Sequence, residues 1–394
     1  MPKTRPDGIL DSMKLGIVLD NRVNKWSMQR FEPMKEEIDI TVFVGERNRY
    51  DIGLMELKKQ PLFHAEEILL GAREPIVAYK RFWTSYRRMD FYYFSLKKYL
   101  KNMDVVFSSD HMRSAYTLSS LKDKLGFKFV LAWWENIPFR CILDPKTHLM
   151  QKSVLDKVDL FLPYTETAKN AMLVEGIPEE KIEVVYPGID LERFKPSNPP
   201  EAVLRKYNIP KGNFVVLYVG KLVSWKGVHN LVYAAKILRD WGIKDFVVAV
   251  AGQGAQKENM ESIIQQSNLK EHFRFLDFVS YADMPDVFKM SDVLVLPSYP
   301  IMTWQEQFGM VLAEAMATGK PVISTLSGSI PEVIGNAGML IPAGDFFALA
   351  KKIQELMENK PLREKLGSKG RERAETLFDA KKNSQKLAKI IKRL

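Results

Sequence analysis

The stretch DVLVLPSYPIMTWQEQFGMVLAEAMATGKPVIST, residues 292–325, contains a complete strand–loop–helix–strand unit. Its first seven residues form an apolar, valine-rich run, which predicts a buried strand that ends at Ser298. A polar loop follows, and a helix is predicted over about 310–318 because a Gly-Lys-Pro stop comes directly after it. A second apolar run then predicts a parallel strand. The unit therefore indicates an α/β fold with two acids, Glu306 and Glu314, near the start of one helix.

The same alternation of short apolar runs and longer helical patterns continues along the whole chain. Runs this apolar are typical of strands that are covered on both faces, as in parallel sheets between layers of helices. We therefore predict two α/β, doubly wound, Rossmann-like domains. The predicted strands are 14–20, 39–45, 104–109, 127–134, 158–164 and 182–188 in the first half, and 213–220, 245–254, 273–278, 292–298, 321–325 and 338–343 in the second.

A proline-rich, polar segment, PGIDLERFKPSNPP (187–200), separates the two series and marks the domain boundary. We predict an N-terminal domain over 1–190, a C-terminal domain over 191–375 and a terminal helix within 376–394. Apolar residues at helical spacing in that last segment predict a helix packed back on the N-terminal domain rather than lying on a membrane. Two such domains would bind ligands in a cleft between the carboxyl ends of their sheets.

Composition narrows the class of protein. The 394 residues carry a formal charge of +10, which favours anionic partners such as nucleotides, phosphorylated substrates or an acidic membrane face. Cys141 is the single cysteine, so an internal disulfide and a multi-thiolate metal site are excluded. The first residues lack the apolar core of a signal peptide, and no apolar run is long enough to span a bilayer. A cytoplasmic protein is expected.

Two further loops carry candidate binding residues. In YVGKLVSWKGVHNL (218–231), Lys221 and Lys226 frame the loop between a strand and a helix, where two cations suit a diphosphate. In VAVAGQGAQ (248–256), Gly252 follows a strand in a turn open enough for a flat ring or a phosphate. Each pattern alone also fits an ordinary surface turn.

Each of the two acids also fits an ordinary structural role. Glu306 fits an ordinary loop acid, and Glu314 fits a solvent-facing helix glutamate. However, Glu314 falls on a helix that should otherwise be an apolar wall of the sheet. A carboxylate there costs free energy unless donors such as sugar hydroxyls satisfy it. Gly309 would let a ligand approach the amide groups at the helix start.

Together these motifs resemble the retaining glycosyltransferase family 4. EQFGMVLAEAMATGKPVISTLSGSIPEVI is similar to its Glu-x7-Glu signature, VGKLVSWKG to its phosphate-binding loop and VVYPGIDLERFKP to its interdomain segment. The resemblance implies a GT-B fold, in which two Rossmann-like domains face each other across a cleft. It also implies a retaining hexosyltransferase that uses a UDP- or GDP-sugar donor and needs no metal or other cofactor.

The resemblance also implies residue roles. Lys221 and Lys226 would hold the donor diphosphate, Glu314 the ribose hydroxyls, and Glu306 the transferred sugar on its reacting side. Backbone groups would bracket the sugar and the phosphates around Gln307, Phe308, Gly309 and Met310. The leaving phosphate oxygen would take the acceptor proton, so that no separate strong base is required.

The N-terminal half departs from the family pattern. A glycine-rich loop is missing after the first strand, and the usual histidine after strand 127–134 is replaced by Trp134 or Glu135. We predict that Glu135 points into the cleft and orients an acceptor hydroxyl or the sugar. A strand-end acid paired with a nearby base is the alternative. His111 is a further catalytic candidate, although a lone histidine is more often structural. Asp277 stands where a glycine is usual, which leaves the nucleotide open.

The segment 79–102 holds nine aromatic and seven basic residues against one acid, Asp90. As a basic, aromatic helical face it fits an anionic membrane that presents a lipid-linked acceptor. A helix with its aromatic rings in the core and its cations in water is the simpler alternative, and the pattern slightly favours it. Binding of single-stranded nucleic acid is disfavoured because no nucleic-acid-binding motif accompanies it.

The leading hypothesis is thus a cytoplasmic glycosyltransferase, associated with the inner face of the membrane, that acts on a sugar or lipid-linked acceptor. Two alternatives remain on the same fold. One is a nucleotide-sugar epimerase, and the other is a non-catalytic nucleotide-sugar-binding protein.

Overall fold

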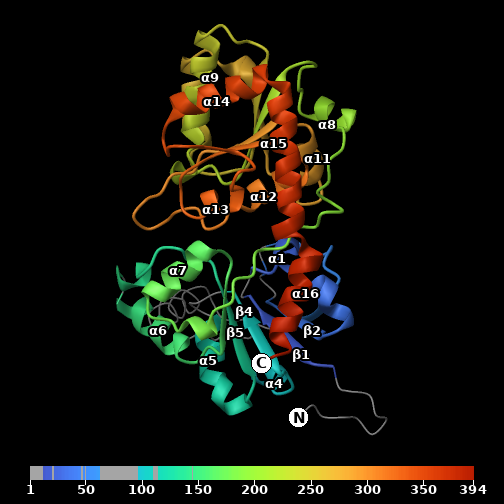
Figure 1. Cartoon of the computed structure of the whole chain (residues 1–394), viewed down its shortest axis with the longest axis vertical. Helices are drawn as coiled ribbons and strands as arrows, with labels where there is room; N and C mark the ends of the chain where they lie inside the picture. Colours follow the sequence, from blue (N-terminus) through green and yellow to red (C-terminus); the bar gives the residue numbers. More distant parts are fainter. Residues whose placement is uncertain are drawn as a thin grey trace, which may run out of the picture.

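The structure, a computed structural model, describes residues 12–19, 22–45, 48, 50–62, 96–109, 114–143 and 145–394. These residues form two bodies stacked along the long axis of the molecule, and each is built around one parallel sheet (Figure 1). Helices flank both sheets. The prediction of an α/β fold with two doubly wound sheets is confirmed.

The first sheet, in the N-terminal body, has six strands in the order β3-β2-β1-β4-β5-β6. The chain builds outward in both directions from the boundary between β1 and β4. Its strands are β1 (Lys14–Val18), β2 (Asp39–Gly45), β3 (Lys58–Leu62), β4 (Val105–Ser108), β5 (Lys128–Trp133) and β6 (Leu160–Pro163). Its helices are α1 (Lys25–Met28), α4 (Leu96–Leu100), α5 (Ser114–Leu125), α6 (Pro145–Leu155) and α7 (Glu166–Val174), with short 3₁₀ helices η1 (Glu32–Glu36), η3 (Arg140–Leu143) and η4 (Glu179–Lys181).

The second sheet, in the C-terminal body, has the order β12-β11-β10-β7-β8-β9 and reverses between β10 and β7. Its strands are β7 (Phe214–Val219), β8 (Phe246–Ala251), β9 (Phe273–Asp277), β10 (Val293–Leu296), β11 (Val322–Thr325) and β12 (Met339–Ile341). Its helices are α8 (Glu201–Lys206), η5 (Ser224–Lys226), α9 (Val228–Asp240), α10 (Lys257–Gln266), η6 (Lys270–His272), α11 (Met284–Lys289), α12 (Met310–Ala317), α13 (Ile330–Ile334), α14 (Phe346–Glu358) and α15 (Lys360–Arg373).

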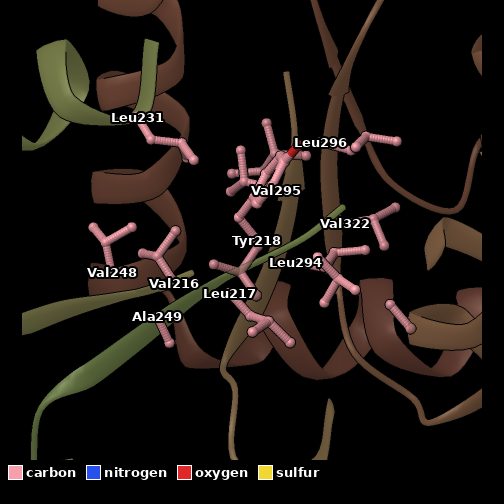
Figure 2. Packing of buried hydrophobic residues seen from close by; sticks show 14 of the residues in the cluster. Val216, Leu217, Tyr218, Leu231, Val248, Ala249, Leu294, Val295, Leu296 and Val322 are labelled. Atoms are coloured by element: carbon pink, nitrogen blue, oxygen red, sulfur yellow. The ribbon is translucent and has the colours of Figure 1, made fainter. Parts of the chain in front are cut away.

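The core of the C-terminal body explains why its strands were recognisable from sequence. Every residue of β7, β8, β10 and β11 is buried, because helices cover both faces of the sheet. Val216 and Leu217 of β7 pack close to Val248 of β8 and Leu294 of β10, with Leu231 of α9 above them (Figure 2). Such a core fixes the central strands, and therefore fixes the loops at their carboxyl ends.

Two parts of the strand prediction need correction. The segment 182–188 is not a strand. It runs beside β6, but only an isolated bridge between Phe161 and Ile182 forms, since Pro163 has no amide hydrogen to donate. Conversely, β3 was not predicted, because its sequence KKQPL is mostly exposed. It pairs with β2 at the sheet edge, where charged residues and a proline are tolerated.

The chain crosses between the two bodies twice, first at about 186–194 and again from the end of α15. Hydrogen bonds join the two crossings. Ile189 donates to the Phe378 carbonyl (2.6 Å), and Ala380 donates back to the Ile189 carbonyl (3.0 Å). The second crossing comprises the end of α15 and a π-helical turn, η7 (Ala374–Phe378), and leads into α16 (Ala380–Ile391), drawn in red in Figure 1. Arg371 of α15 donates to the carbonyls of Phe194 and Ala317, which ties the first crossing to the end of α12.

Helix α16 belongs to the N-terminal body although it ends the chain. Its apolar face, which includes Leu387 and Ile391, lies in the same buried cluster as β1 and β2. On its polar face, Lys392 pairs with Glu37 (2.6 Å). In the described residues, no helix combines the length and the apolar character needed to cross a bilayer.

We expect Leu387→Ala to destabilise the N-terminal body by about 2 to 5 kcal/mol, because it leaves a cavity where the side chain is fully buried. Lys389→Ala on the exposed face of the same helix is the matched control. Urea unfolding followed by circular dichroism measures both. Equal midpoints for the two variants would contradict the packing of α16 described above.

Candidate active site

The site lies where the second sheet changes direction. In an open α/β sheet, ligands bind outside the carboxyl ends of the strands at the point where the strand order reverses. That point falls between β7 and β10. The loop with Lys221 and Lys226 follows β7, and the loop with Glu306 follows β10. The two sequence motifs are therefore brought together by the topology of the sheet.

The centre of the site is an ion pair between the two loops. Lys226 Nζ lies 2.6 Å from Glu306 Oε2, and Ser298 Oγ donates to the same oxygen at 2.9 Å. Glu306 is only 6% exposed. A carboxylate this deeply buried needs such partners, since desolvation disfavours its charge.

Aromatic rings line one side of this pair. The Lys226 ammonium lies 4.8 Å from the centre of the Trp304 ring, and the Trp225 and Trp304 rings are 6.1 Å apart. A cation over an aromatic face is stabilised without losing its charge. The Tyr299 amide also donates a hydrogen bond to the Trp225 carbonyl (3.0 Å), which joins the backbones of the two loops.

Two glycines permit the close approach of these loops. Both have positive φ, +69° at Gly227 and +54° at Gly328. A Cβ at Gly227 would lie 1.9 Å from the Pro297 carbonyl oxygen, and one at Gly328 would lie 2.1 Å from the Glu306 carbonyl oxygen. No side chain fits at either position. The glycines therefore let α9 and the turn after β11 pack directly on the loop that carries Glu306.

The loops after β7 and β8 are also joined. Leu222 donates to the Gln253 carbonyl (2.9 Å), and Gly252 donates to the Asp277 carbonyl (2.8 Å). Lys221 is exposed, and its carbonyl accepts a bond from the buried Tyr218 hydroxyl at 2.8 Å. Lys221 and Gly252 thus border the same edge of the sheet.

The segment Gln307–Met310 leads into α12, and its members differ in role. Phe308 is buried and packs against Phe378 (5.4 Å between ring centres) at the second crossing. Gly309 is the N-cap residue of α12, so amide groups at the helix start are left for a ligand. Gln307 and Met310, on either side, are partly buried.

Glu314 is buried in α12, as the apolar wall around it predicts, and no described side chain donates a hydrogen bond to it. Burial raises the pKa of its carboxyl to about 8, although the charge of Arg193 opposes the shift. Arg193 itself is held by the Tyr281 carbonyl (2.6 Å). Glu314 is therefore largely protonated at neutral pH.

Of the two candidate residues in the N-terminal body, Glu135 and His111, the structure describes only Glu135. Glu135 is buried, forms an ion pair with Arg140 and accepts a bond from the Ile137 amide (3.2 Å). These contacts match the alternative of a strand-end acid paired with a base. His111 lies outside the described residues, as does most of the segment 79–102, of which the structure describes only 96–102.

Sequence reasoning missed several residues that build the site. Ser298, Trp304 and Arg193 all fall inside the quoted motifs, but none belongs to a residue type that by itself indicates a role. Asn136, next to Glu135, was missed too, and its amide donates to the Glu306 carbonyl at 2.9 Å. Among the described residues, no cluster of three or more His, Cys, Asp or Glu side chains could hold a metal ion.

Comparison with known proteins identifies the family. A model of glycosyltransferase family 4 matches residues 45–193, and a model of glycosyl transferases group 1 matches residues 201–373. The chain belongs to these family 4, or group 1, glycosyltransferases. The family prediction is thus confirmed, and the two matches account for both bodies.

Two individual relatives are 30% and 26% identical to this chain over the matched residues. The capsular polysaccharide biosynthesis glycosyltransferase CapM of Staphylococcus aureus is 30% identical over 280 residues, which are 67% of this chain and 66% of CapM. A D-inositol 3-phosphate glycosyltransferase of Streptomyces bingchenggensis is 26% identical over 57% of this chain and 51% of its own length. The chain thus spans about half to two thirds of these curated relatives.

A solved structure shows the fold over nearly the full length. The crystal structure of Anabaena HepE in complex with UDP has a TM-score of 0.75 at 19% identity, covering 97% of this chain and 100% of HepE. The prediction of a GT-B fold is confirmed.

The raised pKa of Glu314 predicts how stability varies with pH. The folded protein keeps a proton up to about pH 8 that the unfolded chain loses near 4.5. This carboxyl therefore lowers the free energy of unfolding as the pH rises between those values. Glu314→Gln should remove that loss, on the order of a few kcal/mol by pH 8. Urea unfolding at several pH values measures it, with the exposed Glu261→Gln as control. Parallel pH profiles for wild type and Glu314→Gln would contradict the assignment.

Proposed function

We propose that this protein transfers a hexose from a UDP- or GDP-sugar to an acceptor hydroxyl with retention of anomeric configuration. The observation that carries the proposal is the Lys226–Glu306 pair at the β7–β10 switch point, beside the exposed Lys221 and the start of α12. Family membership supports the reaction class. The HepE structures in complex with UDP and with UDP-glucose support the donor class.

In this proposal the C-terminal body holds the donor. Lys221, Lys226 and the amides before α12 face the diphosphate, where negative charge gathers as the bond to the sugar breaks. Glu314 accepts hydrogen bonds from the ribose hydroxyls, which supply the donors that its carboxylate lacks. Glu306 contacts the sugar. Lys226 then divides its charge between Glu306 and the leaving phosphate.

The transfer step needs no additional base, because the leaving phosphate takes the acceptor proton. The acceptor oxygen bonds to the anomeric carbon on the face from which the phosphate oxygen departs. The acceptor proton passes to that phosphate oxygen, and a nucleoside diphosphate leaves. No metal or cofactor takes part in this scheme, so activity should survive treatment with EDTA.

A panel of UDP- and GDP-sugars, with and without acceptors, tests the proposal through release of the nucleoside diphosphate. Lys226→Met and Glu306→Gln should each lower kcat roughly 100-fold or more, because each removes charge stabilisation at the reacting centre. Lys236→Met, on the exposed face of α9, should leave kcat unchanged. Proton NMR of the product gives the anomeric configuration.

The double variant Lys226→Met/Glu306→Gln separates folding from chemistry. Each single change removes one charge of the ion pair and should lower thermal stability, whereas the double change removes both charges. Stability should therefore recover without recovery of transfer. Tight binding of a nucleotide-sugar with no turnover under any acceptor would instead support the non-catalytic alternative, and interconversion of free nucleotide-sugars would support an epimerase.

We further propose a cytoplasmic location at an anionic membrane face, on the basis of the basic, aromatic segment 79–102. Neutralising its seven cations should reduce co-sedimentation with vesicles that contain phosphatidylglycerol, because each cation near such a surface contributes about 1 kcal/mol. Neutralising exposed lysines of α16 is the control for net charge. Equal losses in both variants would contradict a specific role of 79–102.

A further inference from the structure

The two bodies are joined by hydrogen bonds that end on the Glu306 loop and on the segment after β11. Asn136, in the loop after β5, donates through Nδ2 to the Glu306 carbonyl (2.9 Å) and to Ser329 Oγ (3.0 Å). Thr165, before α7, contacts the same Ser329 hydroxyl at 3.1 Å. Asn136, Thr165, Ser329 and Glu306 are all buried, so these bonds are shielded from water.

A second contact lies beside the first. Glu332 of α13, in the C-terminal body, accepts bonds from the amides of Glu166 (2.6 Å) and Thr167 (2.9 Å) and from Thr167 Oγ1 (2.8 Å). These groups form the first turn of α7 in the N-terminal body. The hydroxyl of Tyr186, in the first crossing, donates a fourth hydrogen bond to the Glu332 carboxylate at 2.9 Å. A carboxylate at the start of a helix is stabilised by the free amides and by the helix dipole.

Both contacts involve one short segment, 328–332, that also packs on Glu306. The Ser329 amide donates to the Glu306 carbonyl (2.9 Å), and Gly328 allows that approach. The Glu306 carbonyl is therefore bonded from its own body by Ser329 and from the opposite body by Asn136. A change in the angle between the bodies would break the bond from Asn136 and leave the carbonyl with the bond from Ser329 alone.

Asn136 carries a buried polar atom that destabilises the fold, which indicates that its hydrogen bonds serve a purpose other than folding. The Glu306 carbonyl can only accept, so the amide nitrogen must face it, and Asn136 Oδ1 is then buried without a donor in the described part of the chain. An unsatisfied buried acceptor destabilises a fold. Alanine at this position would remove that cost, but it would also remove the bond to Glu306.

We propose that Asn136 and Glu332 form a cross-cleft latch that sets the main-chain position of Glu306 when the two bodies close. Both act as positioning residues, and the inference rests on the proposed transfer reaction. Lys221, Lys226 and Glu314, the proposed contacts to the nucleotide, all lie in the C-terminal body, and their described contacts do not include Asn136 or Glu332. Loss of the latch therefore slows transfer and leaves donor binding intact.

Steady-state kinetics and calorimetry on the full chain test the latch. Asn136→Ala and Glu332→Ala should lower kcat about 10- to 100-fold, as expected when a reacting group is displaced by about 1 Å. Affinity for UDP or GDP should change by less than about threefold because the changes lie outside the donor contacts. Glu332→Gln keeps one acceptor oxygen and should give an intermediate kcat.

Glu166→Gln is the matched control. It removes an exposed charge from the first turn of α7 but keeps the backbone amide that bonds Glu332, so kcat should equal that of wild type. Thermal unfolding of Asn136→Ala should also match wild type, which separates positioning from a folding defect. Parallel losses of kcat and donor affinity would overturn the proposal.

Two structural readouts do not require turnover. Small-angle X-ray scattering should show a larger radius of gyration for Glu332→Ala than for Glu166→Gln, and the Glu166 and Thr167 amides should exchange faster in Glu332→Ala. Unchanged scattering and exchange would overturn the latch even if wild type transfers sugar. A wild type that transfers no sugar, with scattering and exchange shifted as expected, would instead refute the proposed function and leave the physical latch established.

Discussion

A carboxylate buried away from water must be paired, and Glu306 is paired with an ammonium from the other half of a divided sheet. Glu306 follows β10 and Lys226 follows β7, the two strands from which the chain builds outward in opposite directions. Their contact requires the loop after β7 to lie closer to the end of β10 than any side chain at Gly227 would allow. This one requirement sets the separation of the two loops. It thereby also sets where the aromatic pair, the start of α12 and the segment after β11 must lie.

The two acids of one motif satisfy the same physical constraint in different ways. The charge of Glu306 is compensated within the chain by Lys226 and Ser298. Glu314 receives no hydrogen bond from the described side chains, and its pKa rises to about 8, so the buried charge is avoided by protonation. Their eight-residue separation therefore does not make them an acid–base couple. One is a carboxylate balanced by Lys226, and the other is a carboxyl group whose pKa is raised by burial.

How far the sequence predicts the structure depends on whether the deciding contacts are local. Strands β7, β8 and β10 were predicted because burial on both faces leaves a continuous apolar run. Strand β3 was missed because an edge position accepts lysines and a proline, and 182–188 was mistaken for a strand because its pattern does not reveal that Pro163 of its neighbour lacks a donor. Lys226 and Glu306, which the sheet brings into contact, lie in motifs that the sequence pattern had already singled out. Asn136 and Glu332 were not predicted, since their partners lie 170 and 165 residues away and their contact depends on how the two bodies sit.

The contacts of Glu306 divide between its main chain and its side chain. Asn136 and Ser329 bond the carbonyl, whereas Lys226 and Ser298 bond the carboxylate. Within the described residues, the hydrogen bond from the N-terminal body to Glu306 therefore reaches its main-chain carbonyl and not its carboxylate. A bond from Asn136 to the carboxylate would compete with Lys226 and disturb the charge balance on which the buried acid depends. A bond to the carbonyl fixes where the residue lies and leaves that balance unchanged. The N-terminal body thus bonds the main chain of Glu306, while the charge of its side chain is balanced within the C-terminal body.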